Sequence, residues 1–141
     1  MTPERMAAIH KAAFTSQRPW TEREFADLLN SSNNFSVEVD DHTFAIGQAV
    51  AGEAELLTIA THPDFQRQGF GCKCLKIFVE RVRSLEADTI FLEVDEGNTA
   101  AIALYTSADF NSAGRRRAYY KHANGERSDA ILMIFSTKWS I

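Results

Sequence analysis

The stretch Gln66-Arg67-Gln68-Gly69-Phe70-Gly71 decides the fold class of this 141-residue chain. It follows an apolar run, 56–60, and a turn that contains Pro63, and it opens an amphipathic segment, 71–85. A strand, a glycine-bearing loop and a helix are therefore expected in sequence. The first N–H groups of a helix have no partner within it, and the helix dipole adds positive charge there. The stretch predicts a loop that holds the phosphates of a nucleotide-containing ligand.

Two common phosphate-binding loops do not fit this stretch. It has no Gly-Lys-Ser/Thr, so it is not a P-loop. The strand before it ends in a proline turn, whereas a dinucleotide-binding fold has a tight Gly-x-Gly turn at that place. The stretch alone does not identify which nucleotide-containing ligand binds.

Length and composition predict one domain over residues 1–141. The net charge of -4 argues against a general nucleic-acid binder and mildly favours a basic peptide or amine as substrate. No apolar run approaches ~18 residues, so no membrane span is expected. The N-terminus lacks the apolar region of a signal peptide. We therefore expect a cytoplasmic protein with no membrane partner.

The two cysteines are Cys72 and Cys74. They lie two apart on a predicted helix, so they point to different sides, and we expect reduced thiols. Cys-x-Cys alone lacks a third and fourth ligand at usable spacing, and the four histidines are scattered. No metal site is expected.

Hydrophobic periodicity and turn residues predict an α/β (α+β) chain with a mixed, mostly antiparallel twisted sheet flanked by helices. Helices are favoured by the cap Thr2-Pro3 and by a capping box from Thr21 to Glu24. The strand–helix–strand crossover around 71–85 implies one parallel pair. The predicted elements are helices near 3–14 and 22–29, strands at 35–39, 43–50 and 53–60, a helix at 71–85, a strand at 89–94, a helix at 99–107 and a hairpin of 111–121 with 130–135.

This order of elements around the glycine stretch resembles the GNAT family of N-acetyltransferases. Gln66-x-x-Gly69-x-Gly71 matches the family's Gln/Arg-x-x-Gly-x-Gly/Ala acetyl-CoA motif. Residues 58–71 are similar throughout to the RimI-like branch, the bacterial ribosomal-protein alanine acetyltransferases. The resemblance covers roughly 19–135. Its other blocks are Leu92-Glu93-Val94, Asn98, 100–105, 116–120, 124–126 and 129–133.

The chain departs from the family pattern in three places. Family members usually begin with a strand before the first helix, so the sheet is expected to be one strand short. Asp109 stands where many members have glycine, at a left-handed position after a helix. Cys72 stands where a basic residue is common.

The resemblance implies transfer of an acetyl group from acetyl-CoA to a primary amine by direct attack on the thioester. It assigns Glu93 as proton acceptor, through a water, and Tyr105 as proton donor to the leaving thiolate. Glu93 is a lone carboxylate in an apolar strand, where burial makes a carboxylate a better base. Two alternatives stay open: an outward-facing carboxylate near a strand end, and a core-packing tyrosine.

The resemblance also implies a donor-binding set. Backbone groups at a strand end would pair with pantetheine like an added strand, and the glycine loop would take the pyrophosphate. Asn98 is a donor contact, a helix cap or both, and Arg67 is a phosphate partner or a solvated side chain. The implied residues are Ile59, Ala60, Thr61, Arg67, Gln68, Gly69, Phe70, Gly71, Cys72 and Asn98.

A basic, aromatic run, Arg115-Arg116-Arg117 with Tyr119-Tyr120, leaves three interpretations open. It binds a substrate peptide, it binds the 3′-phosphate of the donor, or it is an edge strand protected by charges.

The acceptor implied by the resemblance is a protein N-terminus, the N-terminal alanine of the eighteenth small-subunit ribosomal protein. Alternatives are a small amine, a different protein, or a non-catalytic acyl-CoA-binding regulator. The intact pair Glu93 and Tyr105 argues against the regulator. We expect a monomer or a weak homodimer.

Overall fold

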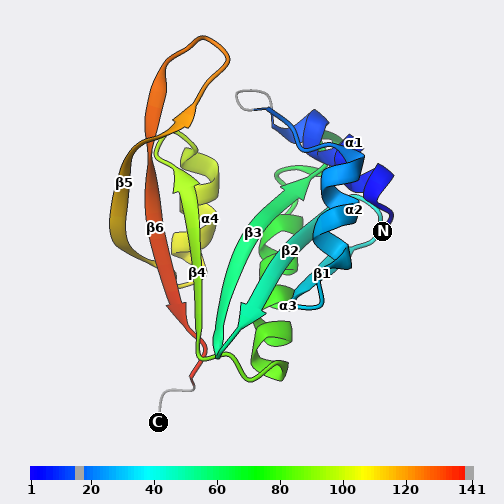
Figure 1. Ribbon diagram of the computed structural model, residues 1–141, viewed down its shortest axis with the longest axis vertical. Helices are drawn as coiled ribbons and strands as arrows, with labels where there is room; N and C mark the ends of the chain where they lie inside the picture. The colour runs from blue at the N-terminus through cyan, green and yellow to red at the C-terminus, as the bar shows by residue number, and fades with distance from the viewer. Residues whose placement is uncertain (15–17, 139–141) are drawn as a thin grey trace.

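Six strands form one mixed sheet in the order β1-β2-β3-β4-β6-β5 in the computed structural model of the chain, which describes residues 1–14 and 18–138 (Figure 1). The elements are α1 (Pro3–Ala13), α2 (Glu22–Asn30), β1 (Asn34–Val39), β2 (Thr43–Val50), β3 (Glu53–Thr61), the 3-10 turn η1 (Pro63–Phe65), α3 (Phe70–Ser84), β4 (Thr89–Asp95), α4 (Thr99–Ser107), β5 (Asn111–Lys121) and β6 (Arg127–Ser136). The predicted fold class is confirmed, and the described sheet has no strand before α1.

The local signals that start and end the helices act as the sequence predicts. Thr21 accepts from the Glu24 N–H at 3.2 Å, and the Glu24 carboxylate accepts from the Thr21 N–H at 3.1 Å, which completes the capping box. Asp109 has φ 70°, so the left-handed site after α4 is occupied by aspartate. No described helix is long and apolar enough to cross a membrane.

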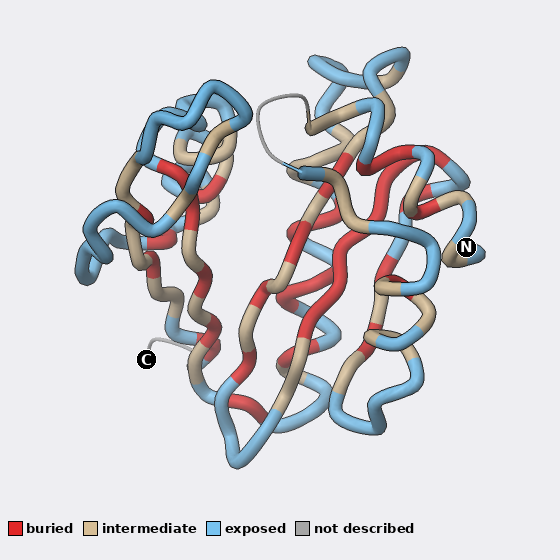
Figure 2. Tube along the Cα trace, turned by 45° about the horizontal axis from the view of Figure 1, so that its top comes forward, coloured by how far each residue is buried: buried red, intermediate tan, exposed pale blue. Residues whose placement is uncertain are grey.

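The described helices cover both faces of the β1–β3 half of the sheet, but they leave one face of β4 uncovered (Figures 1 and 2). α3 packs on β1, β2 and β3 from one side, whereas α1 and α2 pack on β1 and β3 from the other. β2, between these layers, is buried at five successive positions, Thr43 to Gly47. β4 instead alternates between buried residues, on the side of α4, and half-buried ones. The face of β4 opposite α4 is therefore accessible.

The two parallel strands separate soon after they meet. β3 pairs with β4 at Glu53, Ala54 and Glu55, opposite Thr89, Ile90 and Phe91. β3 carries a bulge just beyond, because Ile46 of β2 faces Thr58 while Gly47 faces Leu56. A bulge bends its strand and increases the local twist. β4 stays paired with β6 along its length, so a wedge opens between β3 and β4 toward their carboxyl ends (Figure 1).

His10 of α1 contacts residues on both helices' flanks, Phe14 after α1 and Trp20 before α2. It is 4% exposed and its ring stacks on Phe14 and Trp20, with ring centres 4.3 and 5.2 Å away. Its Nδ1 accepts a hydrogen bond from the Trp20 backbone N–H at 3.1 Å, which requires that nitrogen to be unprotonated. Burial lowers the pKa of the His10 ring to about 4, although Glu24 opposes this.

The free energy of unfolding should fall as the pH drops through the range set by His10. The unfolded ring takes a proton near pH 6.5 and the folded ring only near 4, so His10 contributes its full stability above this range and loses it as the pH falls. Urea unfolding of wild type and His10→Phe between pH 7.5 and 4 tests this. The slope with pH should be smaller in His10→Phe and unchanged in His62→Gln. Equal slopes in all three proteins would contradict the assignment.

Candidate functional site

The glycine stretch forms an open helix start at the end of β3. Gly69 is the N-cap of α3 with φ 84°, and none of the described side chains caps it. The Lys73 N–H donates to the Gly69 carbonyl at 3.0 Å, so the N–H groups of Phe70, Gly71 and Cys72 precede the first helical bond. Arg67 is also left-handed, with φ 63°. Alternating backbone conformations of this kind form concave anion sites, so the loop suits a pyrophosphate.

The side chains of the loop mostly hold the loop itself. Gln66 Nε2 donates to the Thr61 carbonyl at 3.0 Å, and Gln68 Nε2 donates to the Asp64 carbonyl at 3.3 Å. Gln68 therefore offers a ligand its backbone rather than its amide, and the Thr61 carbonyl already has a donor. Arg67 is exposed, so both of its interpretations remain.

The rings of His42, Phe65 and Phe70 pack together beside the glycine loop. The His42 ring is 3% exposed and stacks on Phe65 at 4.0 Å with an angle of 9° between the rings. It also lies 4.4 Å from the ring of Phe70. These two phenylalanines flank the loop on both sides in sequence, so His42 ties the turn and the start of α3 to β2.

The wedge leaves one edge of β3 without a strand. Ile59, Ala60 and Thr61 pair with β2 on one side, and on the side of β4 no described strand pairs with them. Such an edge can pair with the amide groups of an extended ligand. This edge runs from the free N–H groups at the start of α3, which we call the cradle, to the residues at which β3 pairs with β4.

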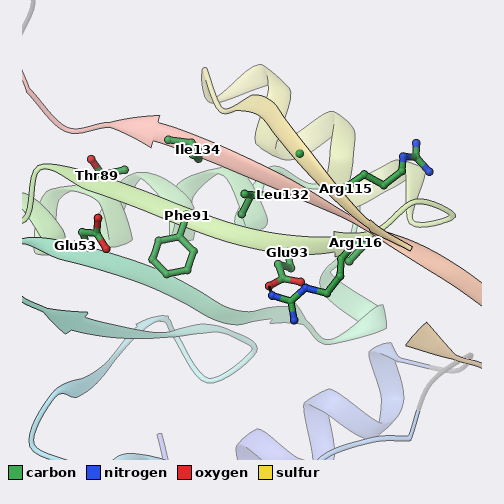
Figure 3. A pocket seen from close by; sticks show the side chains of 10 residues that line it. Glu53, Thr89, Phe91, Glu93, Arg115, Arg116, Leu132 and Ile134 are labelled. Atoms are coloured by element: carbon green, nitrogen blue, oxygen red, sulfur yellow. Dashed lines mark ion pairs between the residues drawn. The ribbon is translucent and has the colours of Figure 1, made fainter. Parts of the chain in front are cut away.

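Glu93 lies on β4 on the accessible face of the sheet. Its Oε1 is 3.0 Å from Nη2 of Arg116, and its Oε2 is buried without a hydrogen-bond partner among the described residues. Figure 3 shows Arg116 turned toward Glu93 and Arg115 turned away. Glu93 thus faces outward near the end of its strand, as its structural alternative expects, but its side chain is only 22% exposed.

Tyr105 approaches β4 from the opposite side. It is 7% exposed on α4 and belongs to the same core cluster as Leu92 and Val94, the neighbours of Glu93 in sequence. Since successive strand residues face opposite sides, Glu93 and Tyr105 lie on the two faces of β4. Burial, and then the charge of Tyr120, raise the pKa of the Tyr105 phenol. It therefore stays protonated at neutral pH and can donate.

Tyr120 contacts the backbone of Glu93, and the sequence named it only as part of the basic, aromatic run. Its hydroxyl donates to the Glu93 backbone carbonyl at 3.3 Å. Burial, and then the charge of Glu93, raise the pKa of Tyr120 to about 12. The sequence offered only a tyrosine pair within a basic run, with no sign of which ring turns inward.

A bulge in β5 directs this tyrosine. Arg116 faces Ala130 of β6 and Tyr120 faces Ser128, so residues 117–119 lie opposite the single residue Asp129. Asp129 accepts from the Ala118 N–H at 2.8 Å and from Arg115 Nη1 at 2.8 Å. The Ala118 N–H, and then Arg115, hold the pKa of Asp129 below its usual range. Arg115 thus belongs to a structural network.

A cavity of about 490 Å³ lies beside Glu93 on the accessible face (Figure 3). Its floor is largely apolar, with Phe91, Leu132 and Ile134, and charged groups stand at its rim. The remaining lining residues are Glu53, Thr89, Glu93, Gly114, Arg115, Arg116 and Ala130.

The last two predicted donor contacts lie at helix starts. The Asn98 side chain accepts from the Ala101 N–H at 3.2 Å, so its role as a helix cap is confirmed. Cys72 is half-buried in the first turn of α3 and is a free thiol, as is the buried Cys74.

The comparisons with known proteins agree with this architecture. Residues 4–110 match the Acetyltransferase (GNAT) family. The [ribosomal protein bS18]-alanine N-acetyltransferase of Escherichia coli K12 is 40% identical over 135 residues, which cover 94% of this chain and 90% of the relative. The N-alpha-acetyltransferase RimI of Mycobacterium tuberculosis is 30% identical over 126 residues, with 84% and 78% covered.

Solved structures show the same fold. The crystal structure of the ribosomal-protein-S18-alanine N-acetyltransferase from Escherichia coli is similar with a TM-score of 0.86 and 35% identity, over 99% of this chain and 90% of that one. Ard1 from Thermoplasma volcanium reaches a TM-score of 0.81 at 22% identity, over 99% and 95%, which concerns the fold alone. The cradle, the wedge and these similarities lead to one conclusion: the chain belongs to the GNAT family of acetyltransferases.

Proposed function

We propose that this protein transfers the acetyl group of acetyl-CoA to the N-terminal α-amino group of a protein, with the N-terminal alanine of ribosomal protein bS18 as the favoured acceptor. The observation that carries the proposal is the wedge between β3 and β4, which has a phosphate cradle at its open end and Glu93 and Tyr105 on either face of β4. The acceptor follows from the relatives named above, which cover most of this chain.

Acetyl-CoA fits the wedge in an extended form. Its pyrophosphate would bind the N–H groups at the start of α3, and its pantetheine would run along the open edge of residues 59–61. The thioester would then reach the point where β3 and β4 meet. Holding it against the amine contributes about 7–11 kcal/mol to lowering the barrier, so no protein nucleophile is needed.

Two proton transfers complete the reaction. The amine nitrogen forms the C–N bond to the thioester carbonyl and the C–S bond breaks. The proton lost by the amine passes through a water to the Glu93 carboxylate, whose Oε2 has no other partner in the described chain. The thiolate of CoA takes the phenolic proton of Tyr105. The products are an N-acetylated chain and CoA with a free thiol, and proton exchange through water returns Glu93 to its carboxylate and Tyr105 to its phenol.

The cavity beside Glu93 is the place for the acceptor. It is apolar at its floor, which favours an acceptor with an apolar side chain, and its rim carries two glutamates and two arginines. The net charge of the whole chain, -4, favours a basic acceptor. A single domain, a cytoplasmic location and a monomeric or weakly dimeric state complete the proposal.

Replacing either proton-transfer group should lower turnover while the donor still binds. For Glu93→Gln and Tyr105→Phe we expect kcat to fall by about 10²-fold or more, the usual contribution of a positioned acid or base. CoA release with a peptide that begins with alanine measures kcat, and calorimetry measures acetyl-CoA affinity. Glu4→Gln, which removes an exposed carboxylate on α1, is the matched control. Unchanged turnover in Glu93→Gln would remove Glu93 from the mechanism.

The acceptor class is tested with the wild-type protein. Peptides that begin with Ala, Ser, Met or Lys are compared with a panel of small amines at equal concentration. We expect the highest kcat/KM for the alanine peptide with the bS18 sequence. A higher value for any small amine would overturn the proposed acceptor.

A methyl group at Gly69 should weaken donor binding selectively. A Cβ there meets no atom within 4 Å, but at φ 84° an L-residue is strained by about 1–2 kcal/mol, so the loop shifts. We expect Gly69→Ala to raise the KM for acetyl-CoA several-fold with little change in kcat. Gly52→Ala creates the same strain at φ 83°, also without a contact within 4 Å, at the opposite end of β3. Equal donor KM values in both variants would argue against the cradle.

A further inference from the structure

Arg116 makes a contact that the mechanism above leaves unexplained. Its guanidinium lies 3.0 Å from Oε1 of Glu93, although the Arg116 side chain is 61% exposed. An exposed ion pair contributes little to stability, typically ~0–1 kcal/mol. The contact therefore has no evident purpose in folding, but it occupies one oxygen of the proposed base and leaves the other.

The pairing of β5 with β6 determines where Arg116 lies. It forms the last regular pair of β5 with β6 before the bulge of residues 117–119. Its guanidinium carbon lies 4.7 Å from the centre of the Tyr119 ring, a cation–π distance. Arg115, its neighbour, is bound on the other side by Asp129 and Glu96. Alternation along the strand thus directs one arginine to the network and the other to Glu93.

The groups that face Glu93 come from two further strands. Glu55 of β3 is half-buried, and burial, and then the charge of Glu93, raise its pKa while Arg116 opposes this. Tyr120 of β5 lies against the Glu93 carbonyl. The carboxylates of Glu93 and Glu55 therefore lie near each other, and the Arg116 guanidinium acts on both of them.

We infer that Arg116 is a positioning residue for the base in the proposed function: it holds Oε1 of Glu93, so that Oε2 keeps a fixed direction for taking the proton of the amine. A bonded guanidinium fixes the orientation of a carboxylate, because its N–H groups lie in one rigid plane. Of the three interpretations of the arginine run, Arg116 then belongs to the acceptor side and not to the 3′-phosphate of the donor.

The activity test compares kcat with the alanine peptide in wild type and Arg116→Gln at saturating acetyl-CoA. Without the guanidinium, the Glu93 carboxylate loses the partner that fixes its direction. We expect kcat to fall by roughly 10-fold, less than the loss expected for Glu93→Gln. The KM for acetyl-CoA should stay within twofold of wild type.

Two further variants separate this role from general effects. Arg116→Lys keeps the charge but loses the planar fork, so it should recover only part of the lost kcat. Lys121→Gln removes a charge from the same strand, away from Glu93, and should follow wild type. An unchanged kcat in Arg116→Gln, or a raised KM for acetyl-CoA as its only effect, would overturn the inference.

A measurement without turnover separates this inference from the proposed function. A ¹³C NMR spectrum of the glutamate carboxyl groups in the free protein at neutral pH observes Glu93 directly, with its signal assigned from Glu93→Gln. The Glu93 signal should shift in Arg116→Gln, because its bonded partner is lost, and should stay in place in Lys121→Gln. If the signal shifts but no peptide is acetylated, the proposed function fails and the pairing stands. If the signal does not shift, the inference fails whatever the activity.

Discussion

The brief parallel pairing of β3 with β4 is the constraint on which the rest of the site depends. After Glu55 and Phe91 the two strands part, while β4 remains paired with β6 to its end. The bulge at residue 57 turns β3 away, and α3, which connects the two strands, begins at the far end of the opening. The start of α3, the open edge of β3 and the two groups proposed to transfer protons all take their places from this separation.

In the proposed reaction, the two parts of the sheet have different tasks. β3 and α3 supply the backbone groups proposed to hold the donor, whereas β4 and α4 supply Glu93 and Tyr105. The proposed proton-transfer groups therefore lie in or against one continuous block, in which β4 pairs with β6 at seven positions and β6 pairs with β5. The distance from Glu93 to Arg116 is set by this block alone. Under the proposal, variation in the glycine loop would change donor affinity without changing that distance.

The sequence was sufficient for features written in a few adjacent residues. The capping box at Thr21 and the cap at Asn98 each follow from residue type and position, whereas the left-handed site at Asp109 followed from the family resemblance. The ion pair of Arg116 with Glu93 could not be predicted in this way, because it depends on the register of β5 on β6 and of β6 on β4. A bulge changes which side chains face a given side, and its residues carry no distinctive sequence. For the same reason the inward turn of Tyr120 and the network around Asp129 were not predicted, and the roles of the arginine run stayed open.

The unpaired edge at residues 59–61 has a thermodynamic consequence. Backbone groups in this position are costly unless they are bonded to something, and a ligand that bonds them only in the folded state shifts the folding equilibrium. The donor would then act as the strand that the wedge lacks, so that occupancy and folding stability rise together. At a free donor concentration 100 times the Kd this linkage is worth about 2.7 kcal/mol. The abundance of the intact protein in a cell would accordingly depend on the supply of its own substrate.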